Sequence, residues 1–306
     1  MCTTAACGSI SDQTTAAPAV ESAWGAFIPS VLPAAGSTRS LIRQLTGLAG
    51  TPPEYLHRFA AIGDSAPIAE FDAIADAGAT ALLTLEPWIA GAGIDQPSHS
   101  LARIAAGAFD ADLHRWGAEL GAWGRPVLLR FAQEMNGTWY PWSIGVNGNT
   151  AADYRATWKR MRAGIRSAGA ANVEFVWAPN VVTEGTTAFV DAYPGADQVD
   201  RVALDGYNWG AAPGHHWQSP ADLFSASLAT LRDLDSTHPI LITEVASADG
   251  PSPEDKAGWI RDFLTIVDAE PRLEGFLWFQ TDKERDWRFN STQVSLAAFR
   301  DGVVGR

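Results

Sequence analysis

A carboxylate lies among aromatic residues in the stretch from Arg125 to Trp142, which reads RPVLLRFAQEMNGTWYPW. The apolar run at 127–129 follows a proline and is too short for helical periodicity, so it is predicted to be a buried strand. The side chains that follow it and could carry chemistry are Arg130, Gln133, Glu134, Asn136, Trp139, Tyr140 and Trp142. Sugar chemistry needs such a set, because it requires a proton donor and flat surfaces for the apolar faces of sugar rings. The alternative, a salt-bridged Glu134 in a Trp-rich core, gives little reason to crowd four polar residues into positions 130–136.

Glycoside cleavage uses two carboxyl groups, one to protonate the leaving oxygen and one to attack the anomeric carbon or activate water. The second candidate is Glu244, in the segment PILITEVAS, 110 positions after Glu134. Tyr207, in LDGYNWG, can supply a hydroxyl that orients this second carboxylate. Asp205 in the same segment is equally consistent with a role in the site and with a structural role toward a neighbouring loop.

The rest of the chain alternates between strand-like and helix-like segments, and this alternation predicts how the two carboxylates meet. The expected strands cover 24–28, 55–59, 81–85, 127–129, 173–178, 200–204, 239–243 and 275–279. The expected helices cover 41–48, 68–77, 101–123, 151–168, a short segment near 188, 221–235, 254–268 and 291–299. Eight strands without a Gly-rich dinucleotide turn favour a single-domain (β/α)8 TIM barrel over an open sheet. In such a barrel the ends of the fourth and seventh strands face each other across the mouth.

Barrels of this kind place their chemistry at the carboxyl ends of the strands. Polar and aromatic residues dominate the predicted strand ends, from Glu86 and Trp88 after the third strand to Trp278, Gln280 and Asp282 after the eighth. We therefore predict Glu134 and Glu244 as catalytic residues. The predicted substrate-binding residues are Arg130, Gln133, Asn136, Trp139, Trp142, Trp177, Tyr207, Trp209, Trp278 and Trp88.

Composition limits the possible partners. The net charge of −13 argues against nucleic acid and anionic membrane surfaces, whereas thirteen Trp residues suit a neutral carbohydrate polymer. No apolar run is long enough to span a membrane. We expect a monomer without a cofactor or a metal. His215 and His216 lie in a Gly/Pro-containing loop, where a loop or subsite wall is favoured over a metal site.

Residues 1–20 are rich in Ala, Ser and Thr and are predicted to be a flexible tether, followed by a catalytic domain over 21–306 without an appended carbohydrate-binding module. Both cysteines, Cys2 and Cys7, fall in the tether. Either they are incidental, or Cys2 carried the lipid of a bacterial lipoprotein. We expect a secreted or surface-tethered protein, because the body is free of cysteine and the site suits a polymer.

Four segments, RFAQEMNGTWYPW, LDGYNWG, ILITEVAS and FLWFQTDKERDWR, resemble glycoside hydrolase family 26, a clan A barrel family of retaining endo-β-glycanases. The likeness runs from about Trp24 to the last helix and includes LTLEPW and NVEFVWAPN. It implies that Glu134 is the acid/base, Glu244 the nucleophile, Tyr207 the tyrosine that contacts the nucleophile, and Trp278 the floor of the cleavage subsite. Arg130 and Trp139 also match family positions around the acid/base. One position departs from the family, which usually has His before the acid/base where this chain has Gln133.

The segment EMNGTWYPW resembles the sequences of the family branch that acts on β-glucans with mixed β-1,3/β-1,4 linkages. We therefore expect hydrolysis of a mixed-linkage or β-1,4 β-glucan by double displacement. The alternatives are an endo-β-1,4-mannanase, then a β-1,3-xylanase, and from another class a non-catalytic glycan-binding barrel. Both carboxylates are present, which argues against the last. A metal-dependent or phosphate-handling barrel would need a His/Asp cluster or a Gly-rich phosphate loop, and the sequence has neither.

Overall fold

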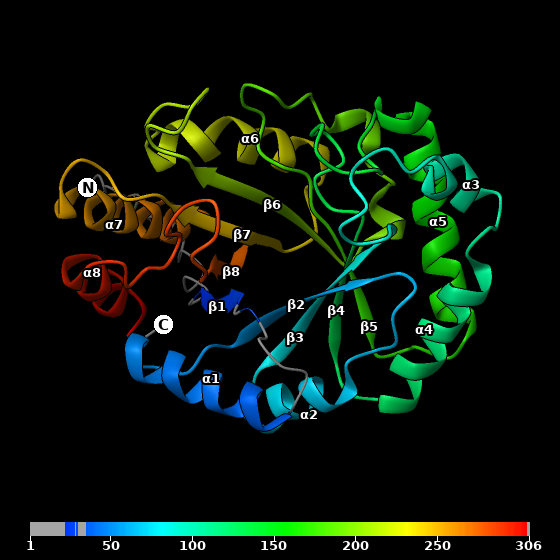
Figure 1. Ribbon diagram of the computed structural model, residues 1–306, viewed down its shortest axis with the longest axis horizontal. Coiled ribbons are helices and arrows are strands. Elements are labelled where there is room, and N and C mark those ends of the chain that lie inside the picture. Colours follow the sequence, from blue (N-terminus) through cyan, green and yellow to red (C-terminus); the bar gives the residue numbers. More distant parts are fainter. Residues whose placement is uncertain (1–21, 28, 30–34, 305–306) are drawn as a thin grey trace, which may run out of the picture.

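The computed structural model describes residues 22–27, 29 and 35–304, and the predicted tether over 1–20 lies outside these residues. Its strands form a closed parallel barrel in the order β1-β2-β3-β4-β5-β6-β7-β8 (Figure 1). The strands are β1 Ala23–Phe27, β2 Tyr55–Ala61, β3 Thr80–Glu86, β4 Val127–Phe131, β5 Val173–Trp177, β6 Arg201–Asn208, β7 Ile240–Ser247 and β8 Leu273–Phe279. The predicted (β/α)8 barrel is therefore confirmed.

Helices surround the barrel as an outer ring (Figure 1). They are α1 Ala35–Ala49, α2 Ile68–Asp76, α3 Leu101–Ala105, α4 Asp110–Trp123, α5 Ala151–Ser167, α6 Pro220–Leu234, α7 Pro253–Ala269 and α8 Gln293–Val303. No helix among the described residues is long and apolar enough to cross a membrane.

Two helix predictions were wrong. The helix expected over 101–123 is divided into α3 and α4, and between them Gly107 has a φ of 98°, which favours glycine and interrupts the helix. The short helix expected near 188 is absent from the described residues, where two 3-10 turns, Val190–Ala192 and Ala196–Gln198, connect β5 to β6. The eight α-helices of the described residues are thus distributed unevenly, with two between β3 and β4.

Side chains alternate between the inside of the barrel and the helix layer, as strand geometry requires. An apolar cluster lies inside the barrel and consists of Leu82, Leu128, Val176, Ala178, Ala203, Leu241 and Leu277. Two residues further along β3, β4, β6 and β7, the inner positions become polar and remain buried: they are Thr84, Arg130, Asp205 and Thr243. His57 of β2, two residues after Tyr55, is buried with them. This polar layer must satisfy its own hydrogen bonds, because water cannot reach it.

Gly25 of β1 has no room for a side chain. A Cβ there would lie 2.5 Å from the carbonyl oxygen of Tyr55 and 2.6 Å from its Cβ. We predict that Gly25→Ala forces β1 away from β2 and lowers the free energy of unfolding by about 1–3 kcal/mol. Thermal and urea unfolding would measure this loss.

Gly47 in α1 provides the matched control, since a Cβ there would meet nothing within 4 Å. Gly47→Ala should stabilise the protein by up to about 1 kcal/mol, because alanine favours helix over glycine. Equal effects of the two substitutions would contradict the close approach of β1 and β2.

Candidate active site

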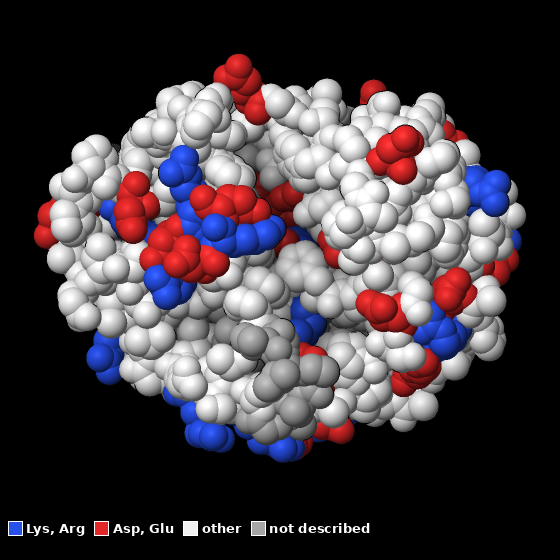
Figure 2. Space-filling model, in the orientation of Figure 1, with Lys and Arg blue, Asp and Glu red and all other residues white. Residues whose placement is uncertain are grey.

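A cavity of about 890 Å³ lies at the carboxyl ends of the strands and is lined by both Glu134 and Glu244. The space-filling view shows a hollow at the centre of this face (Figure 2). Charged side chains of both signs gather beside it, over the loop that joins β8 to α8 (Figure 2). The barrel therefore brings together the two carboxylates that the sequence predicted to share one mouth.

The chain leaves β4 through an unusual backbone turn that aims Glu134 into the cavity. Ala132 has a φ of 46° and Glu134 a φ of 53°, both in the left-handed region that residues other than glycine rarely adopt. The amide of Glu134 is tied to the carbonyl of Ala178 beyond β5, at 2.8 Å. Strained residues of this kind persist only where the surrounding structure fixes them, and they concentrate at functional sites.

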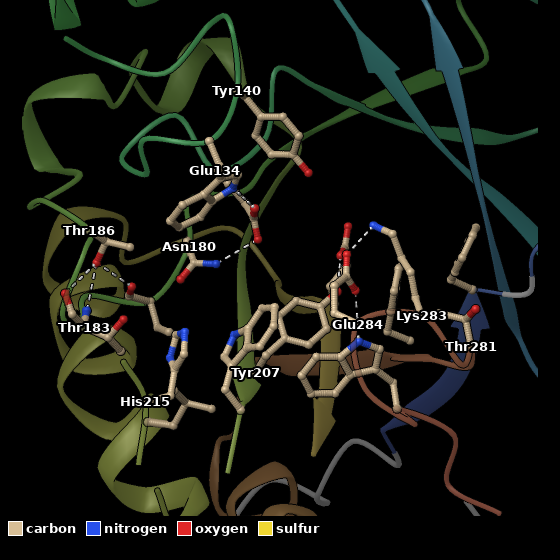
Figure 3. Close-up of a pocket in the computed structure, with 18 of the residues that line it drawn as sticks. Glu134, Tyr140, Asn180, Thr183, Thr186, Tyr207, His215, Thr281, Lys283 and Glu284 are labelled. Atoms are coloured by element: carbon tan, nitrogen blue, oxygen red, sulfur yellow. Dashed lines mark hydrogen bonds and ion pairs between the residues drawn. The ribbon is translucent and has the colours of Figure 1, made fainter. Parts of the chain in front are cut away.

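Two side chains donate hydrogen bonds to the Glu134 carboxyl. Asn180 donates to Oε1 at 2.8 Å and Trp139 donates to Oε2 at 2.8 Å. Figure 3 shows the Asn180 amide pointing at this carboxyl from the side of the cavity. Burial, followed by the negative charge of Glu244, raises the pKa of Glu134 to about 7, although the hydrogen bonds from Asn180 and Trp139 act in the opposite direction. Glu134 is thus able to hold a proton at neutral pH.

Glu244 lies within β7 rather than after it, so the strand is longer than predicted. The pairing of β7 with β8 shifts between Ile242 and Val245, and such a bulge re-aims side chains. Two donors contact the carboxylate: Arg130 binds Oε1 and the hydroxyl of Tyr207 binds Oε2. Glu244 is therefore held by a cation and a phenol, whereas Glu134 is held by an amide and an indole.

Arg130 is completely buried and organises the polar layer. Besides Glu244, it binds Asp205 at 2.6 Å and the hydroxyl of Thr84 at 2.7 Å. Thr243 donates to the other oxygen of Asp205 at 2.5 Å. Burial, then the charge of Arg130, lowers the pKa of His57, which stays neutral beside the guanidinium. The side chain of Asp205 thus pairs with Arg130 inside the barrel, while its backbone binds the segment after β5, through Pro179 at 3.0 Å and Val181 at 2.8 Å.

Four of the ten predicted substrate-binding residues line the cavity: Trp88, Trp139, Tyr207 and Trp209. His215 also lines it and stacks on Trp209, with ring centroids 5.0 Å apart and an interplanar angle of 16°. The interpretation of this loop as a subsite wall fits that position. Among the described residues, no group of three or more His, Cys, Asp or Glu side chains could hold a metal ion.

Three predicted tryptophans do not reach the cavity, because they face the helix layer or lie beneath other rings. Trp278 is fully buried against Trp259 of α7 and Phe299 of α8, so it does not form a floor for substrate. Trp177 points outward and packs on Phe189 and Tyr193, and Trp142 lies under Tyr140 with ring centroids 4.3 Å apart.

The other three predicted residues, Arg130, Gln133 and Asn136, are buried behind the cavity wall. Asn136 donates to the carbonyl of Asn180 at 2.9 Å and accepts from the amide of Asn180 at 2.9 Å. It therefore positions the residue that holds Glu134. Gln133 donates to Glu86 at 3.0 Å. These side chains support the site from behind and do not form its surface.

Sequence reasoning missed several residues that line the cavity, namely Phe27, Phe59, Glu86, Asn180, Phe279, Lys283 and Trp287. Glu86 was noted at a strand end but was not chosen. Phe279 lies two residues after Leu277, whose place inside the barrel is known from the structure. The loop that carries Lys283 and Trp287 is anchored by buried Lys256, which binds the carbonyl of Asp286 at 2.8 Å. No local signal marks that anchor.

Comparison with solved structures supports the fold. The catalytic domain of the GH26 endo-β-1,4-mannanase from Bacillus sp. JAMB-750 superposes with a TM-score of 0.69 at 17% identity, covering 92% of this chain and 85% of that one. The YdhT protein from Bacillus subtilis gives the same TM-score and identity, covering 94% of this chain and 87% of that one. At such identities the likeness shows the fold alone.

Sequence comparison is more specific. Endoglucanase H of Acetivibrio thermocellus is 34% identical over 238 residues, which cover 76% of this chain and 25% of that protein. The β-1,3-xylanase TXYA of a Vibrio species is 27% identical over 226 residues, covering 66% of this chain and 44% of that protein. The chain thus spans less than half the length of either relative. The family description "Glycosyl hydrolase family 26" matches residues 97–256, more than half of the chain, and the chain therefore belongs to this family.

Proposed function

We propose that the protein is a retaining endo-β-glycanase that cleaves a neutral polysaccharide by double displacement. The observation that carries this proposal is the contrast between two carboxyl groups in one cavity. Burial and the charge of Glu244 raise the pKa of Glu134 to about 7, so Glu134 can hold a proton, while Glu244 accepts hydrogen bonds from Arg130 and Tyr207. Two carboxyls with opposed environments suit the roles of acid and nucleophile.

In the first step, Glu134 gives its proton to the glycosidic oxygen while an oxygen of Glu244 bonds to the anomeric carbon and the leaving chain departs. In the second step, Glu134, now a carboxylate, takes a proton from water, and the water oxygen displaces Glu244. Both displacements invert the anomeric carbon, so the product keeps the β configuration. Trp139 and Asn180 fix the carboxyl that transfers the proton in both steps.

For the substrate we propose a β-glucan with mixed β-1,3/β-1,4 or with β-1,4 linkages. Support comes from endoglucanase H, which is 34% identical over 76% of this chain. The second candidate is a β-1,4-mannan, favoured by the mannan endo-1,4-β-mannosidase of Caldalkalibacillus mannanilyticus, 35% identical over 92 residues. The β-1,3-xylanase relative makes β-1,3-xylan the third. Such polymers are too large to enter a cell, so we extend the proposal to a secreted or surface-tethered protein.

Glu244→Ala should lower kcat by about 10⁴-fold, because it removes the nucleophile. Azide should restore turnover by occupying the space of the lost carboxylate, and it should give an α-glycosyl azide from a β-linked aryl glycoside. Glu134→Ala with azide should instead give a β-glycosyl azide, since azide then attacks the glycosyl-enzyme. NMR of the products distinguishes the two anomers.

The control is Glu254→Ala, at a carboxylate on α7 that is 69% exposed and for which we expect wild-type turnover. The same azide anomer from both active-site variants would exclude the assigned roles. Binding of a polysaccharide by the wild type without any hydrolysis would instead indicate a glycan-binding barrel. A product analysis on mixed-linkage glucan, carboxymethyl cellulose, galactomannan and β-1,3-xylan would identify the sugar.

The pH dependence of kcat/KM should report the protonation of Glu134. A general acid must carry its proton, so activity should fall as the pH rises through about 7. Trp139→Phe keeps an aromatic ring but removes the indole donor that lowers the pKa of Glu134. The descending limb should therefore move toward higher pH.

Trp217→Phe provides the control, because this tryptophan is 37% exposed and its loss leaves the hydrogen bonds of Glu134 intact. Its pH profile should match that of the wild type. A shift of the Trp139→Phe profile toward lower pH would contradict the role of the indole donor.

A further inference from the structure

Three further glutamates, Glu86, Glu184 and Glu284, line the cavity, and the proposed mechanism uses none of them. Glu86 ends β3, is 8% exposed, and shares the cavity with Glu134 and Glu244. Burial raises the pKa of Glu86 to about 7, although the hydrogen bond from Gln133 acts in the opposite direction and the charge of Glu244 adds to the increase. A carboxyl of this kind is sensitive to what the cavity contains.

Gln133 lies behind Glu86 and does not face the cavity. Its side chain is completely buried, and its Nε2 donates to Oε1 of Glu86 at 3.0 Å. Its amide oxygen is a buried acceptor with no hydrogen-bond partner within the part of the chain that the structure describes. An unpaired buried acceptor destabilises a protein, and an apolar side chain of similar shape would avoid this penalty. The bond to Glu86 is thus the interaction that the Gln133 side chain contributes.

Glu86 has acceptor capacity beyond this single bond. A carboxylate has two oxygens and about four lone-pair sites, and the Gln133 amide occupies one of them. Trp88 and Phe59 line the cavity on the same side of the barrel, on the β3–α3 connection and on β2, and offer flat surfaces to a sugar ring. A carboxyl group that shares the cavity with such surfaces suits a sugar hydroxyl, because its second oxygen can accept a hydrogen bond whether the group is ionised or protonated.

We propose that Glu86 determines sugar specificity by accepting a hydrogen bond from a hydroxyl of the sugar bound beside Glu134 and Glu244, and that Gln133 is a positioning residue that acts through Glu86. This inference rests on the proposed glycanase function. The departure from histidine at position 133 then has a physical consequence. The neutral amide of Gln133 fixes the Glu86 carboxyl without adding the positive charge that a protonated imidazole would bring.

The test compares Glu86→Leu, Glu86→Gln, Gln133→Leu and the double variant Glu86→Leu/Gln133→Leu. Each is assayed on aryl β-cellobioside, β-mannobioside and β-xylobioside, which differ at single substituents of the ring. Glu86→Leu should lower kcat/KM on the preferred glycoside by about 10- to 100-fold and change the ratios among the three. Glu86→Gln should lose less, because an amide still forms hydrogen bonds.

Gln133→Leu separates stability from activity. Its Tm should stay close to that of the wild type, because loss of the unpaired amide oxygen offsets loss of the hydrogen bond to Glu86, while kcat/KM falls by about 3- to 10-fold. In the Glu86→Leu background the same substitution should have no further effect. The matched control for Glu86→Gln is Glu270→Gln, at a carboxylate that is 5% exposed, bound by Arg232 and located at the end of α7, for which we expect unchanged kcat/KM.

The outcomes are distinguishable. A wild type that hydrolyses none of the three glycosides and none of the polysaccharides overturns the proposed function, and this inference with it. If the wild type is active, two results overturn this inference alone. In the first, Glu86→Leu lowers kcat/KM on all three glycosides by one common factor. In the second, the losses of kcat/KM caused by Glu86→Leu and Gln133→Leu multiply in the double variant. If Glu86→Leu does not fold, the other two variants decide. Full activity of Gln133→Leu and Glu86→Gln, with unchanged ratios of kcat/KM among the three glycosides, likewise overturns this inference alone.

Discussion

A guanidinium group without access to water, that of Arg130, is the constraint on which the site depends. A buried charge is tolerated only when opposite charges and hydrogen-bond acceptors surround it, and removing one partner leaves the others uncompensated. Arg130 obtains these partners from β3, β6 and β7, through Thr84, Asp205 and Glu244. Strands that are distant in the chain must therefore close around one side chain. The closed barrel supplies this geometry, and the polar layer exists because Arg130 is there.

The distinct roles proposed for the two catalytic carboxyls follow from their distance to this cation. Glu244 contacts Arg130 directly. Glu134 instead accepts hydrogen bonds from the amide of Asn180 and the indole of Trp139, and the charge of Arg130 has a smaller effect on its pKa. The charge of Glu244 acts in turn on Glu134 and favours its protonated form. One fixed positive charge thus places the two carboxyls in opposite environments inside a single cavity.

The barrel and the convergence of Glu134 and Glu244 could be predicted from the sequence, because strand alternation and residue types at strand ends are local signals. The face of the barrel wall to which a strand residue points could not be predicted, since an error of one residue in the strand assignment moves a side chain from the cavity to the helix layer. Trp278 and Trp177 were misplaced in this way and pack against helices and connecting segments. The bulge in β7 and the left-handed φ of Glu134 depend on tertiary contacts that leave no pattern in the chain.

Gln133 shows how a resemblance can identify an important position and misjudge its contact. The residue before Glu134 was predicted to bind substrate, yet its side chain is buried and meets Glu86 instead. The chain turns sharply at Glu134, with a φ of 53°, and consecutive side chains leave such a turn in different directions. Glu134 enters the cavity and Gln133 passes behind its wall. In this chain the side chain at position 133 therefore meets the cavity through its neighbour Glu86, an acidic residue that lines it.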